Sequence, residues 1–400
     1  MPQRRRTQRQ QQQAPRRSRS VFVRTNGRTL AIVAGSAVVI AAIAATVWLS
    51  TTRTAPPLAS QSGSGGNATA STTQVSLPDF GQVAADTAAD APPPEIGTPT
   101  PGIAGPTAVV VTNSPWQILV NRGLVADLQA PSGVAVDGEG NLYVVDFGGS
   151  FVQKFSPGGQ ALDRFGQKGS GPGQFSGPMD VAVDGQGNIY VADTNNQRIQ
   201  KLSSAGKPLA SWGSGGDGAG QFWLPSGVAV DDQGKVYVAD RGNHRIQVLS
   251  ASGQPLAQWG SRGPAPGQFW APTDVAVDGR GQIYVADSNN QRIQVLSADG
   301  QPLAQWGWEG TDPGTFSLPS SLSLDAAGNV YVADTRNARI QKLSPTGQPL
   351  AAWGVVSGAN TPRPAPEAGT FVSPGGIAVD KNNTVYVTDT RNQRIQKLAQ

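Results

Sequence analysis

The chain has 400 residues, with 50 glycines, 31 prolines, one histidine and no cysteine. The absence of cysteine excludes disulfide bridges, thiolate nucleophiles and cysteine-ligated zinc sites. The net charge of +4 is unevenly distributed, because residues 1–29 hold nine arginines and no acidic residue. The remainder has 22 basic and 27 acidic residues. No nucleic-acid-binding surface is therefore expected on the folded part.

Residues 30–50 form an uninterrupted apolar run, LAIVAGSAVVIAAIAATVWLS, without a charged side chain. A helix of this length spans roughly 32 Å, close to the hydrocarbon thickness of a bilayer. The arginines before it predict a cytoplasmic N-terminus and an exported C-terminal part. We therefore expect a retained single-pass signal anchor in the cell membrane, with a cleaved signal peptide as the alternative.

Residues 51–106 are rich in Ser, Thr, Ala, Gly and Pro and show no apolar periodicity. Such a segment cannot bury enough apolar surface to fold. As a coil it reaches about 40 Å. It is expected to be a disordered linker that holds residues 107–400 away from the membrane.

The C-terminal part repeats itself. Proline opens each unit, at spacings of 47, 47, 47, 47 and 55 residues: Pro131, Pro178, Pro225, Pro272, Pro319 and Pro374. One unit contains four short runs typical of strands, separated by turn sequences: Gly227–Asp231, Lys235–Asp240, Arg245–Ser250 and Pro255–Trp259. Four antiparallel strands in a unit of about 40–50 residues are typical of the blade of a β-propeller.

The sixth unit stops after its third strand, so another segment must complete it. Trp116–Val120 is the predicted donor, because Ile118 lies 13 residues before the first opening proline, as Trp259 lies 13 residues before the fourth. Leu128 then takes the place of Phe269. Pairing the first strand with the last blade closes the ring and removes its free edges. The expected fold is all-β, a six-bladed propeller of four-stranded antiparallel blades closed by an N-terminal strand.

The units share the pattern P-x-x-[VIL]-[AS]-[VL]-D-x-x-[GN]-x-[VIL]-Y-V-x-D, and five continue as D-x-x-N-x-R-I-Q. These five sets begin at Asp193, Asp240, Asp287, Asp334 and Asp389. The first unit keeps Asp146 but has Gly149 and Phe151 where the others have Asn and Arg. The pattern resembles the NHL repeat over about 295 of the 400 residues.

The resemblance implies a six-bladed propeller used as a binding platform, as in exported sensor domains, RNA-binding and ubiquitin-ligase proteins and a few lyases. A ligase RING module needs cysteine, and a lyase zinc site on several histidines cannot be built from His244 alone. No Gly-x-Ser-x-Gly elbow or phosphate-binding loop is present either. Catalysis is therefore less expected than binding.

Positions that recur in every unit are interpreted as structural. The Asp-x-x-Asn-x-Arg sets are expected to form Asx turns and arginine pairs. Aromatic residues that end the fourth strand are expected to cover the seams between blades: Trp212, Trp259, Trp306 and Trp353. A phenylalanine before each later unit is expected to wedge between blades: Phe175, Phe222, Phe269, Phe316 and Phe371.

Positions that differ between units are the candidates for a site. Trp223 and Trp270 follow the wedge phenylalanine in only two loops, and Trp308 occurs in one. Exposed aromatic rings suit stacking on sugars or on a peptide, with packing on the neighbouring blade as the alternative. Loops between the second and third strands carry residues that could contact an acidic or polar ligand, unless they are simply solvated: Arg241, His244, Arg336 and Arg391.

Asp180 and Asp274 begin two inner strands where other units have Gly or Ser. Both are expected to face the channel, where two carboxylates could help hold a divalent cation such as Ca²⁺; a solvated or hydrogen-bonded pair is the alternative. No other cofactor is expected. An insertion around Ser357–Gly369 lengthens one loop on the face that carries the tryptophans.

The sequence thus predicts a membrane-anchored, exported propeller that recognises a cell-envelope polysaccharide, peptide or protein on its loop-rich face. Two alternatives stay open. One is a metal-dependent lyase or lactonase-like enzyme with its site at the channel, and the other is an envelope scaffold protein.

Overall fold

The computed structural model of the chain describes residues 109–110, 116–121, 127–354 and 367–398. The predicted basic tail, membrane segment and linker (residues 1–106) lie outside these residues, as does most of the insertion at 357–369. Within the described residues, no helix is long and apolar enough to cross a bilayer.

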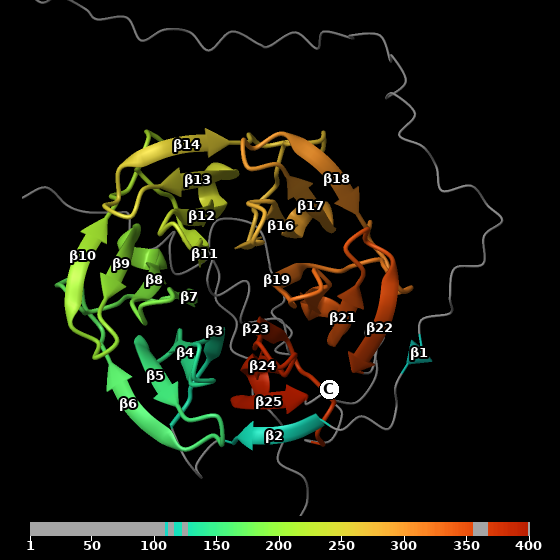
Figure 1. The fold of residues 1–400 in the computed structure, drawn as a ribbon, viewed down its shortest axis with the longest axis horizontal. Helices are drawn as coiled ribbons and strands as arrows, with labels where there is room; N and C mark the ends of the chain where they lie inside the picture. The colour runs from blue at the N-terminus through green and yellow to red at the C-terminus, as the bar shows by residue number, and fades with distance from the viewer. Residues whose placement is uncertain (1–108, 111–115, 122–126, 355–366, 399–400) are drawn as a thin grey trace, which may run out of the picture. The chain divides into compact units, whose positions relative to one another are not determined.

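Six sheets surround a central axis as the blades of a propeller (Figure 1). Blades 1 to 3 consist of β3 (Pro131–Val136), β4 (Leu142–Asp146), β5 (Phe151–Phe155), β6 (Ala161–Phe165); β7 (Asp180–Val183), β8 (Ile189–Asp193), β9 (Arg198–Leu202), β10 (Pro208–Trp212); and β11 (Pro225–Val230), β12 (Val236–Asp240), β13 (Arg245–Leu249), β14 (Pro255–Trp259). Blades 4 to 6 consist of β15 (Asp274–Val277), β16 (Ile283–Asp287), β17 (Arg292–Leu296), β18 (Pro302–Trp306); β19 (Pro319–Leu324), β20 (Val330–Asp334), β21 (Arg339–Leu343), β22 (Pro349–Gly354); and β23 (Pro374–Val379), β24 (Val385–Asp389), β25 (Arg394–Leu398), completed by β2 (Trp116–Val120). Short 3₁₀ turns join the second and third strands of blades 2 to 6: η1 (Thr194–Asn196), η2 (Arg241–Asn243), η3 (Ser288–Asn290), η4 (Thr335–Asn337) and η5 (Thr390–Asn392).

The hydrophobic core lies between neighbouring blades, since the second strand of each blade is buried on both faces. Between blades 3 and 4, for example, Tyr237 and Ile246 pack with Val275 and Ile283 around Phe269. All five predicted wedge phenylalanines are buried to 0 or 1 % exposure. Their interpretation as wedges is therefore confirmed.

The outer-strand tryptophans lie over the seams, as predicted. A Cβ built on Gly300 of blade 4 would come within 2.3 Å of the Trp259 ring of blade 3, so the indole lies directly on this turn. Trp212 and Trp306 cover Gly253 and Gly347 in the same way. These turn glycines have positive φ angles and no side chain, which permits the close contact.

The repeated Asp-x-x-Asn-x-Arg set forms a buried network within each of blades 2 to 6. In blade 3 the Asp240 carboxylate accepts hydrogen bonds from Arg245 Nε, Asn243 Nδ2 and Gln247 Nε2, at 2.8–3.0 Å. Asp240 is fully buried. The Arg245 guanidinium also donates to loop carbonyls, including that of Gln221. The network joins the blade to the loop before it, and the expected arginine pairs are confirmed. The expected Asx turns are wrong in blades 2 to 6, because the aspartates accept a backbone N–H from the preceding loop and do not cap their own 3₁₀ turns.

The ring is closed as predicted, by antiparallel pairing of β2 with β25 (Figure 1). The expected register is wrong by two residues: Val120, and not Ile118, lies opposite Ile395 as Trp259 lies opposite Ile246. An irregularity between Ile118 and Val120 shifts the strand and leaves Ile118 37 % exposed.

The seam between blades 5 and 6 is closed by aromatic packing. The Trp116 ring packs edge-on against Trp353 and Phe371, with centroid distances of 6.3 and 5.2 Å. Leu128, 2 % exposed, occupies the predicted wedge place beside blade 1. A further two-residue strand, β1 (Val109–Val110), pairs in parallel with β22 of blade 5 and was not predicted.

Candidate functional site

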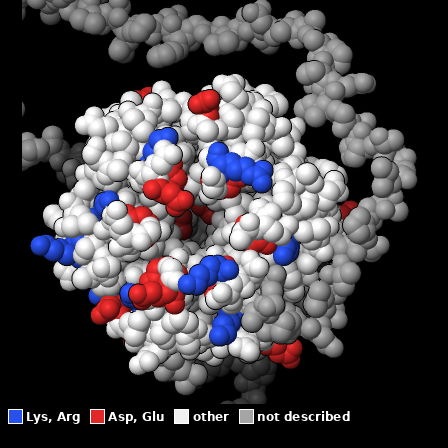
Figure 2. All heavy atoms as spheres, viewed as in Figure 1, with Lys and Arg blue, Asp and Glu red and all other residues white. Residues whose placement is uncertain are grey.

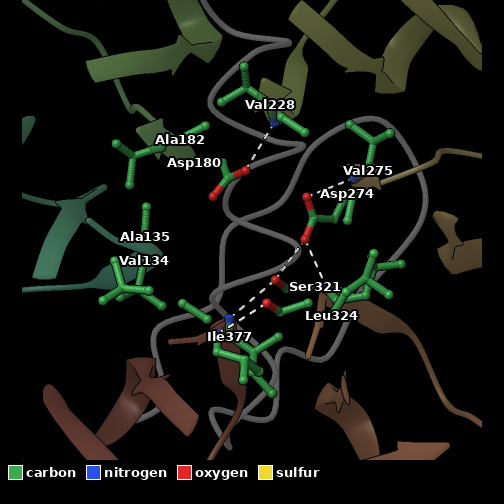
Figure 3. Close-up of a pocket in the computed structure, with 18 of the residues that line it drawn as sticks. Val134, Ala135, Asp180, Ala182, Val228, Asp274, Val275, Ser321, Leu324 and Ile377 are labelled. Carbon is green, nitrogen blue, oxygen red and sulfur yellow. Dashed lines mark hydrogen bonds between the residues drawn. The ribbon is translucent and has the colours of Figure 1, made fainter. Parts of the chain in front are cut away.

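The central channel is a cavity of about 340 Å³ lined by the inner strands of all six blades. Figure 3 shows Asp180 and Asp274 pointing into it from blades 2 and 4. At one mouth an aspartate follows each inner strand: Asp137, Asp184, Asp231, Asp278, Asp325 and Asp380. Figure 2 shows one face of the ring, with acidic and basic side chains around the central hollow.

The channel carboxylates link neighbouring blades. Asp274 Oδ2 accepts hydrogen bonds from Leu322 N at 2.9 Å and Ser321 Oγ at 2.7 Å in blade 5, and its Oδ1 accepts from Val275 N at 2.7 Å. Asp180 Oδ2 accepts a hydrogen bond from Val228 N of blade 3 at 3.0 Å (Figure 3). Both aspartates therefore have a structural role, because their carboxylates join one blade to the next through hydrogen bonds.

Burial sets the protonation of this pair. Burial raises the pKa of Asp274 to about 6 although three hydrogen bonds favour its charged form. Burial and the negative charge of Asp274 hold the pKa of Asp180 well above its usual range. Within the described residues, no group of three or more His, Asp or Glu side chains could hold a metal ion. Calcium takes about 6–8 oxygens, so two carboxylates would supply only part of a site; the cation site stays a prediction.

The three candidate tryptophans are all exposed on loops: Trp223 by 46 %, Trp270 by 42 % and Trp308 by 62 %. The backbone N–H of Trp223 donates to Asp240 Oδ1 at 2.7 Å, and that of Trp270 to Asp287 Oδ1 at 2.8 Å. The buried network therefore fixes both loops while the rings remain accessible.

A contiguous cluster surrounds Trp270 at the seam of blades 3 and 4. The Ala271 N–H donates to His244 Nδ1 at 3.0 Å, so this imidazole bridges the two blades. In other blades glutamine makes the equivalent bond, as Gln197 does to Leu224 N at 2.6 Å. The Arg262 guanidinium lies over the Trp270 ring, 5.3 Å from its centre. Burial and the Arg262 charge lower the pKa of His244, which favours the neutral form at pH 7 with Nε2 carrying the proton.

Trp223 and Arg241 lie in the loops of blade 3, where Trp223 follows the wedge Phe222 of the seam with blade 2. The Gly242 N–H donates to the Trp223 carbonyl at 2.7 Å, and a Cβ on Gly242 would come within 2.0 Å of the ring. Glycine therefore permits the indole to lie on η2. Beside it, burial lowers the pKa of Arg241. In the other four 3₁₀ turns this position is a hydroxyl residue bonded to the opening proline of the next blade: Thr194, Ser288, Thr335 and Thr390.

The remaining candidates lie elsewhere in the ring. Arg336 and Arg391 are exposed in η4 and η5 of blades 5 and 6. Trp308 lies early in the loop that leads to blade 5, where its carbonyl accepts the Phe316 N–H at 2.9 Å. Of the seven predicted ligand-binding residues, Trp270 and His244 lie together at the seam of blades 3 and 4, and Trp223 and Arg241 lie in the loops of blade 3.

Sequence reasoning missed Arg262. It lies eight residues before Trp270, and a parallel bridge between Arg262 and Phe269 turns the loop back on itself. The aligned positions hold Lys168, Gly215 and Glu309, so this position varies between units as the other candidates do. This variation between units could have identified Arg262 as a candidate site residue.

The fold defines a six-bladed β-propeller, the class to which this chain belongs. The family model of the NHL repeat matches six segments: residues 128–155, 175–202, 222–249, 269–296, 316–343 and 371–398. The propeller of this chain is therefore an NHL-repeat propeller.

Similar solved structures include a streptogramin B lyase, with TM-score 0.51 and 16% identity over 71% of this chain and 96% of that one. A gluconolactonase from Xanthomonas campestris gives TM-score 0.54 and 13% identity, over 74% and 94% of the two chains. A protein of unknown function from Bacteroides thetaiotaomicron gives 0.55 and 18%, over 71% and 75%. At these identities the likeness shows the fold alone. No match was found among curated proteins.

Proposed function

We propose that this propeller is a recognition module that binds a cell-envelope polysaccharide, peptide or protein through the loops of blades 3 and 4. The observation that carries this proposal is the pair Trp223 and Trp270, whose rings are about half exposed on loops fixed from below by Asp240 and Asp287. Rigid aromatic rings on a fixed backbone bind at a low cost in conformational entropy. Residues 30–50 would anchor the module in the membrane, with the propeller outside.

A lyase or lactonase-like reaction at the channel is the second candidate. The names of two structural neighbours and the raised pKa of the channel carboxylates favour it. Against it, the described residues offer no complete metal-ligand set. The third candidate function is that of an envelope scaffold protein, in which the propeller only spaces or assembles other proteins.

The test is binding of the full-length chain, in neutral detergent, to the cell-envelope fraction of its source. Trp223→Ala/Trp270→Ala is expected to lose at least tenfold in affinity. Truncating an aromatic side chain that becomes buried in a complex commonly costs about 2 kcal/mol or more of binding free energy, which is about thirtyfold in affinity. The matched control is Leu209→Ala/Leu256→Ala, which removes apolar side chains of similar exposure, 52 and 54 %, from the outer strands.

Equal loss of binding in both double variants, or no loss in the tryptophan variant at unchanged thermal stability, would exclude this face as the site. Retention of only a protein partner would favour the scaffold role. Release of a divalent ion from the purified wild type, and none from Asp180→Asn, would favour the channel.

A further inference from the structure

The loops of blades 3 and 4 that carry Trp223 and Trp270 also contain two cations, Arg241 and Arg262, that the fold does not neutralise. Eight ion pairs are formed within the described residues, and they use Lys154, Arg198, Lys201, Arg245, Arg292, Arg339, Lys342 and Arg394. Neither Arg241 nor Arg262 belongs to one of them. Arg262 is exposed at the surface and lies over Trp270, while Arg241 is partly buried beside Gly242, which supports the Trp223 ring.

All candidate side chains in these loops that can form hydrogen bonds to a ligand are donors. The guanidinium groups and the indole N–H groups of Trp223 and Trp270 have no acceptor. The one acceptor, His244 Nδ1, is already occupied by the Ala271 N–H, which leaves Nε2–H as a donor. A ligand that matches this surface must therefore be rich in acceptor oxygens and carry negative charge.

We infer that the loops of blades 3 and 4 bind an acidic polysaccharide, one whose sugar rings carry carboxylates. This inference rests on the proposed function and names its ligand class. Flat indole faces suit the faces of sugar rings, and a planar guanidinium binds a carboxylate through paired hydrogen bonds. Ring and hydroxyl oxygens would accept from the remaining donors.

An acidic peptide would present carboxylates too, but it lacks the sugar-ring faces that suit the flat indole faces of Trp223 and Trp270. The loop before Trp223 contains one exposed acid, Asp217, six residues away. Its negative charge opposes an anionic ligand. Asp217→Asn is therefore expected to strengthen binding, whereas loss of either arginine weakens it.

The experiment compares polygalacturonate with its fully methyl-esterified form, which has the same chain without the charge. The full-length protein is expected to bind the acid polymer, or alginate as a second polyuronate, at least tenfold more tightly than the ester. Arg262→Gln and Arg241→Gln should each reduce this affinity about tenfold. Lys168→Gln is the matched control, because Lys168 is an exposed cation at the position aligned with Arg262 but is followed by no tryptophan; its affinity should not change.

His244 supplies a second readout, since it is the single histidine of the chain. Its imidazole NMR signal should shift on saturation with polygalacturonate and stay in place with the ester. Failure of both polyuronates to bind, equal binding of acid and ester, or equal losses in Arg262→Gln and Lys168→Gln would overturn the inference. Tighter binding of polyglutamate than of either polyuronate would also do so. If envelope binding then still depends on Trp223 and Trp270, the proposed function survives with another ligand; if it does not, both fail.

Discussion

Two arginines of blade 3, four residues apart, have opposite surroundings. Arg245 is bonded to the buried Asp240 carboxylate at 2.8 Å and to loop carbonyls at 2.6–2.9 Å. Arg241 forms no ion pair within the described residues and replaces a hydroxyl found in four other blades. The repeated arginine is neutralised within the fold, whereas the unrepeated one belongs to none of the ion pairs formed by the described residues.

Tryptophans show the same contrast. Trp353, at the repeated position, is 7 % exposed and stacks on Tyr331 within the seam. Trp270, at an unrepeated position, keeps 42 % of its surface exposed. At these two positions the repeated tryptophan makes a structural contact and the unrepeated one stays exposed. Repetition alone does not imply burial, since the repeated outer-strand leucines Leu209 and Leu256 are 52 and 54 % exposed.

The largest effect is expected where the repeated network is broken. Asp193→Asn should lower the free energy of unfolding by about 3–5 kcal/mol, because the Arg198 guanidinium, with 14 % side-chain exposure, loses its counter-charge. Urea unfolding followed by tryptophan fluorescence measures the loss. Asp163→Asn, at an exposed position of β6, is the control and should change stability by less than about 0.5 kcal/mol. Similar values for the two variants would contradict a structural role for the network.

A smaller loss is expected at the closure. Trp116→Ala should cost about 3 kcal/mol, since the ring is 4 % exposed and contacts Trp353 and Phe371. Hydrogen exchange should show faster opening of β25 in particular. Ile118→Ala, at a 37 % exposed position of the same strand, should cost less than about 1 kcal/mol. The reverse order would show that the register expected from the sequence, and not the observed one, is correct.

The channel gives a pH-dependent effect. The pKa of Asp274 is raised to about 6 and that of Asp180 is also raised, so the folded state holds protons that the unfolded state releases. The contribution of this pair to the free energy of unfolding is therefore greatest below about pH 4 and falls as pH rises toward 6 and above. Asp180→Asn keeps an acceptor for Val228 N and removes one charge. It should raise stability at pH 7–8 on the order of 1 kcal/mol and flatten the pH dependence between 4 and 7.

Urea unfolding at several pH values measures this effect. A less stable variant at pH 8 would show that the Asp180 charge has a favourable partner. Stabilisation of the wild type by Ca²⁺, absent in the variant, would support the predicted cation site.

Much of the fold could be predicted because each blade repeats the same strand and turn chemistry. Spacing alone gave the six blades, the closing strand and the wedge at Phe269. The register of β2 could not be predicted, because counting residues back from the opening proline does not reveal the irregularity between Ile118 and Val120. The pairing of β1 with β22 was missed as well, since two residues carry no periodic pattern.

The candidate site was predicted only in part, for a different reason. Variation between units identified Trp223 and Trp270, but not that loop folding brings Arg262 over Trp270. His244 was a candidate because it lies in a loop between the second and third strands, yet its Nδ1 makes a contact that glutamine makes in blade 2. The reversal of a loop and the hydrogen bond of one side chain to the next blade depend on tertiary structure, and residue spacing did not reveal either of them.

The most direct test compares Arg241→Gln with Arg245→Gln for both stability and retention on the cell-envelope fraction. The contrast between the two arginines predicts crossed effects. Arg245→Gln should lower the free energy of unfolding by about 3 kcal/mol or more, while its folded fraction still binds. Arg241→Gln should unfold within about 0.5 kcal/mol of the wild type and bind about tenfold more weakly. Loss of stability without loss of binding in Arg241→Gln would contradict the account, because it would make the unrepeated arginine a structural residue like its repeated neighbour.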